Sequence, residues 1–153
     1  MSENDLRIQL IPLGGLGEIG KNMLAIRCQD TIIVIDAGLM FPEEELLGID
    51  IVIPDITYLI ENQEKVKAIF LTHGHEDHVG ALPYVLKELN VPVYGSRLTL
   101  GLVEAKLKDN NLEKVDYHVV KPRDMVKIDN MDIEFFRVSH SIPDSMGIAI
   151  HTP

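Results

Sequence analysis

The sequence predicts an α/β fold in which a mixed sheet is flanked by helices. Two observations indicate this class. Apolar and polar residues alternate in strand-like segments over the first 35 residues, and beyond residue 65 strand-like and helix-like segments follow each other in turn. At 153 residues the chain is long enough for one domain with a sizeable core. No linker, repeat or low-complexity segment divides it.

The first part of the chain is predicted to form three strands and one short helix. The expected strands are 6–11, 22–27 and 31–35, which together make an antiparallel meander. Residues 41–48 are expected to form a loop or a short turn of helix. A helix is predicted over residues 55–62, with Asp55 as its N-cap.

The second part of the chain alternates between strands and helices. The expected strands are 68–71, 91–94, 116–120, 125–128, 131–138 and 147–151, and the expected helices are 79–88 and 96–108. Strands that lie before, between and after helices are typical of half of a four-layer αββα sandwich.

The most informative segment is residues 72–78, Thr-His-Gly-His-Glu-Asp-His, which directly follows an apolar strand. It holds three of the six histidines in the chain. Neutral imidazoles and carboxylates are the ligands that zinc, manganese and iron take in hydrolytic sites. Two-metal sites of this kind, with ions about 3.5–4 Å apart, clamp both the attacking and the leaving oxygen. The segment therefore predicts a metal site at a strand end.

The spacing of the motif predicts how its side chains divide. In an extended segment His73 and His75 point to the same side, because side chains alternate with a period of two, and they can share one ion. A turn or helix that begins at about Glu76 carries Asp77 and His78 round to a different direction, where they can hold a second ion.

Together with two later features, this motif resembles the signature of the metallo-β-lactamase superfamily. Asp36 closes the apolar strand 31–35, and a single histidine, His140, ends a later strand. The glycine-rich opening 13–23 and the segment 139–145 are similar to the ribonuclease J family, in the β-CASP branch of that superfamily. The resemblance implies the N-terminal half of a metallo-β-lactamase αββα sandwich.

The resemblance also implies roles for the site residues. The implied metal ligands are His73, His75, His140 for one ion and Asp77, His78 for the other. Asp36 would orient a ligand histidine by accepting its hydrogen bond, and Asp77 would also take a proton from the attacking water. The implied cofactor is two zinc ions in the intact enzyme, with manganese or another divalent ion as the alternative.

The function implied by the resemblance is zinc-dependent hydrolysis of RNA by a metal-activated water. The family acts as a 5′–3′ exonuclease and an endonuclease in RNA maturation, including rRNA processing, and in mRNA decay. RNA is the implied partner, and the intact protein is expected to form a homo-oligomer. Residues 1–153 would be a partial metallo-β-lactamase domain, with the β-CASP domain, the C-terminal domain and the remaining ligands absent from this chain. Such a fragment is expected to bind zinc poorly and to cleave RNA slowly or not at all.

The composition is typical of a cytoplasmic protein without a membrane segment. No apolar stretch approaches the roughly 18 residues that span a bilayer, and residues 1–5 are polar rather than a signal peptide. Cys28 is alone and is expected to be a small strand residue. The net charge of −10 and the scattered basic residues place most RNA contacts outside this chain, although bound cations would change the local charge.

The glycines at positions 15, 17 and 20 fit a dinucleotide-binding fingerprint, but the residues after them are strand-like. The fingerprint requires a helix there, so we predict a tight loop between two strands instead. Within it, Glu18 and Asn22 either touch substrate or are ordinary turn residues. His118 and His151 match no motif position and are expected to be surface or core residues.

Two other functions remain open from the sequence. A hydrolase of the same superfamily that acts on a small thioester, lactone or β-lactam would share every ligand named above. A non-catalytic interaction module that pairs through exposed sheet edges belongs to a different class.

Overall fold

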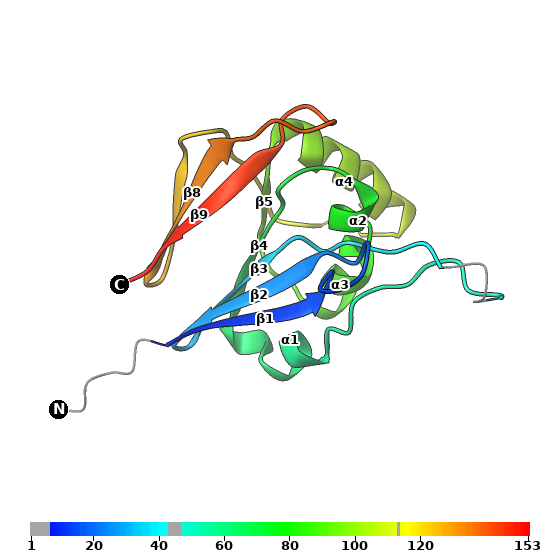
Figure 1. Ribbon diagram of the computed structural model, residues 1–153, viewed down its shortest axis with the longest axis horizontal. Coiled ribbons are helices and arrows are strands. Elements are labelled where there is room, and N and C mark those ends of the chain that lie inside the picture. The colour runs from blue at the N-terminus through cyan, green and yellow to red at the C-terminus, as the bar shows by residue number, and fades with distance from the viewer. Residues whose placement is uncertain (1–6, 43–46, 113) are drawn as a thin grey trace.

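Two sheets lie face to face in the computed structural model, which describes residues 7–42, 47–112 and 114–153 (Figure 1). The larger sheet contains β1 (Ile8–Gly14), β2 (Met23–Cys28), β3 (Thr31–Ile35), β4 (Val66–Phe70), β5 (Val93–Gly95) and β6 (Tyr117–Val119). The smaller sheet contains β7 (Met125–Ile128), β8 (Met131–Arg137) and β9 (Met146–His151). The helices are α1 (Thr57–Glu61), α2 (Glu76–Val79), α3 (Leu82–Glu88) and α4 (Arg97–Asp109), with a 3₁₀ turn at Gln63–Lys65.

The larger sheet is mixed, as the sequence predicts. Strands β1, β2 and β3 form an antiparallel meander, whereas β3, β4, β5 and β6 run parallel to one another. Parallel neighbours need crossover connections, and helices supply them here. As a result, β3 and β4 end at the same edge of the sheet.

The buried strands contribute side chains to two separate cores. In β3, Ile32 and Val34 join the core beneath the helices, while Ile33 joins the core between the two sheets. This division follows from the alternation of side chains along a strand. The second core includes Phe70 and Phe135, whose ring centroids lie 5.9 Å apart. Both faces of β3 and β4 are therefore covered, which explains their continuous apolar sequences.

The predicted helix 79–88 is wrong as a single element, because the chain forms α2 and α3 with a break between them. In a continuous helix the Ala81 N–H would donate to the Asp77 carbonyl. Here the Asp77 carbonyl accepts from the Asn22 N–H at 3.0 Å, and the Ala81 N–H donates to the Ala37 carbonyl at 2.8 Å. The helix opens at this point because both groups bond to other segments.

The predicted N-cap of α1 is also wrong, by one residue. Ile56 occupies that position, and Asp55 Oδ1 instead accepts a hydrogen bond from the Thr57 N–H at 2.9 Å.

Cys28 is buried, as expected of a small strand residue. Residue 6 of the first predicted strand and residues 43–46 of the predicted loop lie outside the described residues. Across the described parts of the chain, no helix has both the length and the apolar character to cross a membrane.

A close backbone contact joins the segment after β3 to α2. A Cβ atom added to Gly38 would lie 1.6 Å from the Asp77 carbonyl oxygen, which no side chain tolerates. The Gly38 N–H also donates to the Asn22 carbonyl at 3.0 Å. Glycine is required here because three backbone segments meet without room for a side chain.

We predict that Gly38→Ala lowers the free energy of unfolding by about 1–3 kcal/mol or more, because backbone rather than a flexible side chain must move. The matched control is Gly101→Ala in α4, where an added Cβ meets nothing within 4 Å. That change should raise stability by about 0.5–1 kcal/mol, since alanine is the better helix former. Urea unfolding followed by circular dichroism measures both. Equal stability of the two variants would contradict the close packing.

Candidate metal centre

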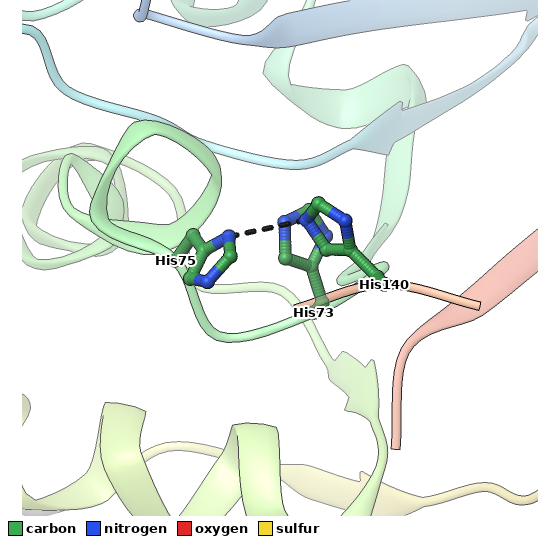
Figure 2. A group of neighbouring side chains, drawn as sticks. All are labelled: His73, His75 and His140. Carbon is green, nitrogen blue, oxygen red and sulfur yellow. Dashed lines mark hydrogen bonds between the residues drawn. The ribbon is translucent and has the colours of Figure 1, made fainter. Parts of the chain in front are cut away.

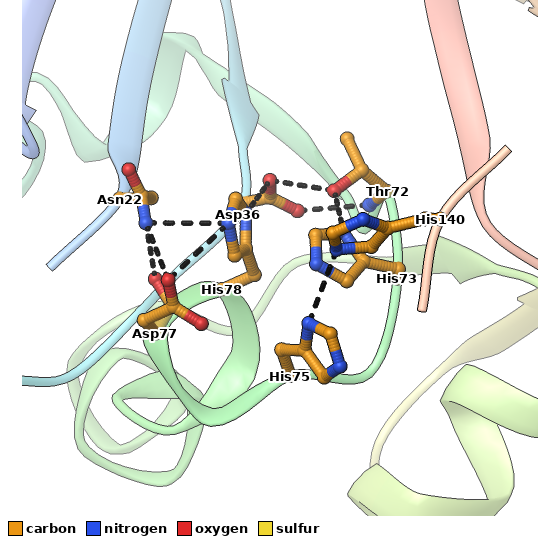
Figure 3. A network of polar contacts seen from close by, with 8 residues as sticks. All are labelled: Asn22, Asp36, Thr72, His73, His75, Asp77, His78 and His140. Atoms are coloured by element: carbon orange, nitrogen blue, oxygen red, sulfur yellow. Dashed lines mark hydrogen bonds and ion pairs between the residues drawn. The ribbon is translucent and has the colours of Figure 1, made fainter. Parts of the chain in front are cut away.

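The candidate site lies at the edge of the larger sheet where β3 and β4 end. Asp36 follows β3, and the predicted motif begins at Thr72, just beyond β4. The loop after β8, residues 138–145, reaches this edge from the smaller sheet (Figure 3). It is attached there by a hydrogen bond from the Met146 N–H to the Thr72 carbonyl at 2.9 Å. Residues far apart in the sequence therefore meet at one point.

Three imidazoles form a cluster at this point. The structure brings together His73, His75 and His140, whose candidate ligand atoms all lie within 4.8 Å of one another (Figure 2). The Nδ1 atom of His75 lies 3.2 Å from the Nε2 atom of His140. The ring of His73 meets both other rings edge-on, with centroids 4.8 and 4.5 Å away. This is the first predicted ligand group.

A hydroxyl group determines which nitrogen of His73 carries the proton. The Thr72 hydroxyl donates its single hydrogen to Asp36 Oδ2 at 2.8 Å. The Thr72 hydroxyl oxygen, Oγ1, lies 2.9 Å from His73 Nδ1. Because its own hydrogen is already donated, it accepts a hydrogen bond from Nδ1–H. The lone pair of His73 is therefore on Nε2, which is buried and has no hydrogen-bond partner among the described residues.

The environment of His73 keeps its ring neutral. The residue is only 6% exposed, and burial, together with the neighbouring imidazoles, lowers the pKa of its ring to about 4. A buried lone pair without a donor is costly, and a bound cation would give it a partner. The donor set thus fits a divalent metal ion.

Asp36 also holds His78 directly. The Nδ1–H group of His78 donates to Asp36 Oδ2 at 2.7 Å, and Asp36 Oδ1 accepts from the Thr72 N–H at 2.8 Å. Burial acts to lower the pKa of His78, but the hydrogen bond and the negative charge of Asp36 outweigh it, so the net shift is upward. Asp36 is buried and has a backbone φ of 61°, a conformation that aspartate tolerates better than most residues.

The second predicted ligand group is assembled around Asn22 (Figure 3). The Nδ2 atom of Asn22 lies 3.1 Å from Asp77 Oδ2 and 3.2 Å from His78 Nε2. Because Nδ2 only donates, His78 Nε2 accepts, in agreement with the proton on Nδ1. The rings of His73 and His78 have centroids 4.1 Å apart, so the two groups adjoin. As predicted, a helix begins at Glu76 and turns the second group away from the first.

Some residues lie differently from what the sequence suggests. His140 does not end a strand, because β8 ends at Arg137 and the histidine lies in the loop beyond it. Glu18 forms an ion pair with Lys21 at 3.0 Å, as an ordinary turn residue does. The glycine-rich segment 15–22 is a loop between β1 and β2, as predicted.

The remaining histidines lie outside the cluster. His118 pairs with Asp116 at 3.1 Å, and His151 pairs with Glu134 at 2.8 Å. Sequence reasoning missed the contribution of Thr72, which links a carboxylate to an imidazole. Its only signal is its place between a buried strand and the first histidine of the motif.

Comparison with known proteins assigns the family. The Metallo-beta-lactamase superfamily profile matches residues 16–145. The chain belongs to the metallo-β-lactamase superfamily. Members of this superfamily bind divalent metal ions, in agreement with the imidazole cluster. The predicted fold class is confirmed.

Two curated relatives from staphylococci share one name. Over 146 residues the chain is 55% identical to Ribonuclease J 2 of Staphylococcus aureus strain MRSA252, and 53% identical to Ribonuclease J 2 of Staphylococcus epidermidis. Each alignment covers 95% of this chain and 26% of the relative. The chain therefore spans about a quarter of the length of these relatives. The resemblance to the ribonuclease J family is confirmed for this part.

Two solved structures have a fold similar to that of this chain, at low identity. A protein of unknown function from Enterococcus faecalis matches with a TM-score of 0.68 and 21% identity, over 94% of this chain and 40% of that one. Zn²⁺-bound PqqB from Methylobacterium extorquens matches with a TM-score of 0.61 and 13% identity, over 86% and 49%. These similarities concern the fold alone.

We predict that Asp36→Asn weakens zinc binding by about 10- to 100-fold, the usual effect of losing a carboxylate that orients ligand histidines. Asparagine keeps the shape and tolerates the positive φ, so the fold should persist. Calorimetric titration with zinc measures the affinity. The matched control is Asp116→Asn, which removes a carboxylate from a different histidine. Unchanged affinity in the Asp36 variant would contradict the orienting role.

Proposed function

We propose that this chain is the metal-binding part of a zinc-dependent ribonuclease that hydrolyses phosphodiester bonds in RNA. The observation that carries the proposal is the 55% identity to Ribonuclease J 2 over 95% of the chain, which includes every candidate ligand. Exonuclease and endonuclease activity, roles in RNA maturation and decay, a cytoplasmic location and self-association belong to the same proposal and rest on that resemblance. The partial character of the domain stays a prediction.

The proposed ligands are the two groups described above, each holding one zinc ion. His73 and His78 both carry their lone pair on Nε2, because hydrogen bonds that end on Asp36 hold their protons on Nδ1. The lone pair of His73 has no donor among the described residues, whereas that of His78 accepts from Asn22 Nδ2, which an ion would displace. Zinc bound here would activate water and stabilise the charge that develops on phosphate. Asp77 is oriented by Asn22 and has further lone pairs with which to bind an ion or take a proton.

The alternative that the ligands leave open is hydrolysis of a small thioester, lactone or β-lactam. A B3 metallo-β-lactamase has a similar fold, with a TM-score of 0.61, but at 16% identity this concerns the fold alone. The much higher identity to proteins named as ribonucleases favours RNA. No contact within the described residues favours a small substrate.

The metal part of the proposal is tested with His75→Ala. This change removes one of the three clustered imidazoles, so zinc affinity should fall at least tenfold, as expected when a ligand is lost. Elemental analysis and calorimetry on the purified chain give the zinc content and the affinity. The control is His118→Ala, a histidine paired with Asp116 outside the cluster. Equal zinc content in both variants would argue against the site.

The substrate part is tested under single-turnover conditions, with the chain in excess over a labelled single-stranded RNA. Cleavage should be slow or absent. Any cleavage should stop with EDTA and fall by about 100-fold or more in Asp77→Asn, since that variant loses the proton acceptor. A thioester, a lactone and a β-lactam are assayed in parallel. Faster turnover of a small substrate than of RNA, or cleavage that persists in EDTA, would overturn the proposal.

A further inference from the structure

We propose that a basic cleft beside the metal centre binds the phosphate backbone of single-stranded RNA. This inference rests on the proposed function and assigns part of its substrate contact to this chain. The basic cleft is the groove of about 750 Å³ that includes Arg97, Lys121, Arg137 and His140 among its lining residues. Its volume lies within the range of about 300–1,000 Å³ that ligand sites occupy.

The fold gathers these cations from segments that are distant in the sequence. Arg97 is the first residue of α4, Lys121 follows β6, and Arg137 is the last residue of β8. The sequence shows no basic run there, and the chain carries 24 acidic but only 14 basic residues. Asp144 is the one carboxylate among the described lining residues. The cleft is therefore locally positive on a protein of net charge −10.

The cations of the cleft are available to an anion. All three side chains are exposed, and none forms an ion pair with another described residue. By contrast, Lys65 and Lys106 are paired with Asp30 and Glu76. The nearby Asp124 carboxylate accepts a hydrogen bond from the backbone N–H of Lys121, not from the Lys121 ammonium group. Unpaired guanidinium and ammonium groups are the usual partners of phosphate.

The cleft leads directly to the metal centre. His140 lines it, and the Nε2 atom of that residue is the one that lies 3.2 Å from His75 Nδ1. The loop that carries His140 is held by a hydrogen bond from the Ser145 hydroxyl to the Ile142 carbonyl at 2.9 Å. Ser96 and Arg97, the N-cap and first residue of α4, also line the cleft, so the helix N-terminus adds partial positive charge.

The chemistry of the lining predicts how RNA is recognised. None of the described lining residues is Phe, Tyr or Trp, and the one imidazole, that of His140, belongs to the candidate metal centre. Bases therefore have no free stacking surface there. Contacts from arginine and lysine to phosphate position a strand without reading its sequence. We therefore expect the cleft to hold the backbone next to the scissile phosphate with little preference for base.

The test is binding of a fluorescein-labelled single-stranded RNA to the whole chain in EDTA, followed by anisotropy at several salt concentrations. Arg137→Gln and, as a second variant, Arg97→Gln should each weaken binding by about three- to tenfold and reduce the salt slope by about one. The matched control is Lys127→Gln, which removes a cation that pairs with Asp132 on the same small sheet and should change little.

Either of two results would overturn the proposed role of the cleft. The first is no RNA binding by the wild-type chain. The second is a loss of RNA affinity in both arginine variants that is no larger than the loss in Lys127→Gln. Strong preference between oligouridine and oligoadenine would overturn backbone recognition. Because binding is measured without metal, it does not depend on catalysis. Arginine-dependent RNA binding by a chain that turns over a small substrate faster than RNA counts against the proposed function alone, whereas metal-dependent cleavage with arginine-independent binding counts against the cleft alone.

Discussion

The buried carboxylate of Asp36 accepts three hydrogen bonds, and two imidazoles of the candidate metal centre take their tautomers from them. His78 donates to it directly, and His73 is linked to it through the Thr72 hydroxyl. Both rings consequently present Nε2 toward the site. Asp36, which follows β3, therefore orients imidazoles that follow β4, and the predicted ligand chemistry depends on this one side chain.

The same region explains why α2 and α3 do not form one longer helix. The break between them removes one helical hydrogen bond, but the Asp77 carbonyl bonds instead to Asn22 and the Ala81 N–H to Ala37. The His78 carbonyl likewise accepts from the Ala37 N–H at 2.7 Å. Backbone polar groups stay satisfied while α2 is joined to the ends of two strands. Asp77 and His78 are thus held by backbone bonds to other segments, rather than by the short helix alone.

The sequence predicted the strands and the pairing of His73 with His75 well, because apolar patterning and motif spacing are local properties. The place of His140 beside them was implied by the family resemblance alone. Other features depend on tertiary partners. The break in the predicted helix 79–88 needs a donor from Asn22 and an acceptor from Ala37. The N-cap at Ile56 contradicts the side-chain preference that favoured Asp55. The Thr72 relay and the gathering of distant cations in the basic cleft arise only when the sheets pack together.

The histidine cluster draws its members from both sheets, since His73 and His75 follow β4 whereas His140 follows β8. The smaller sheet is attached mainly through the inter-sheet core. A cation that engages all three nitrogens binds only when the two sheets are docked, so it acts as a non-covalent cross-link between them. By thermodynamic linkage, free metal at a hundredfold excess over its dissociation constant would add about 2.7 kcal/mol to the docked state. Metal supply thereby becomes a determinant of how cooperatively the two layers unfold.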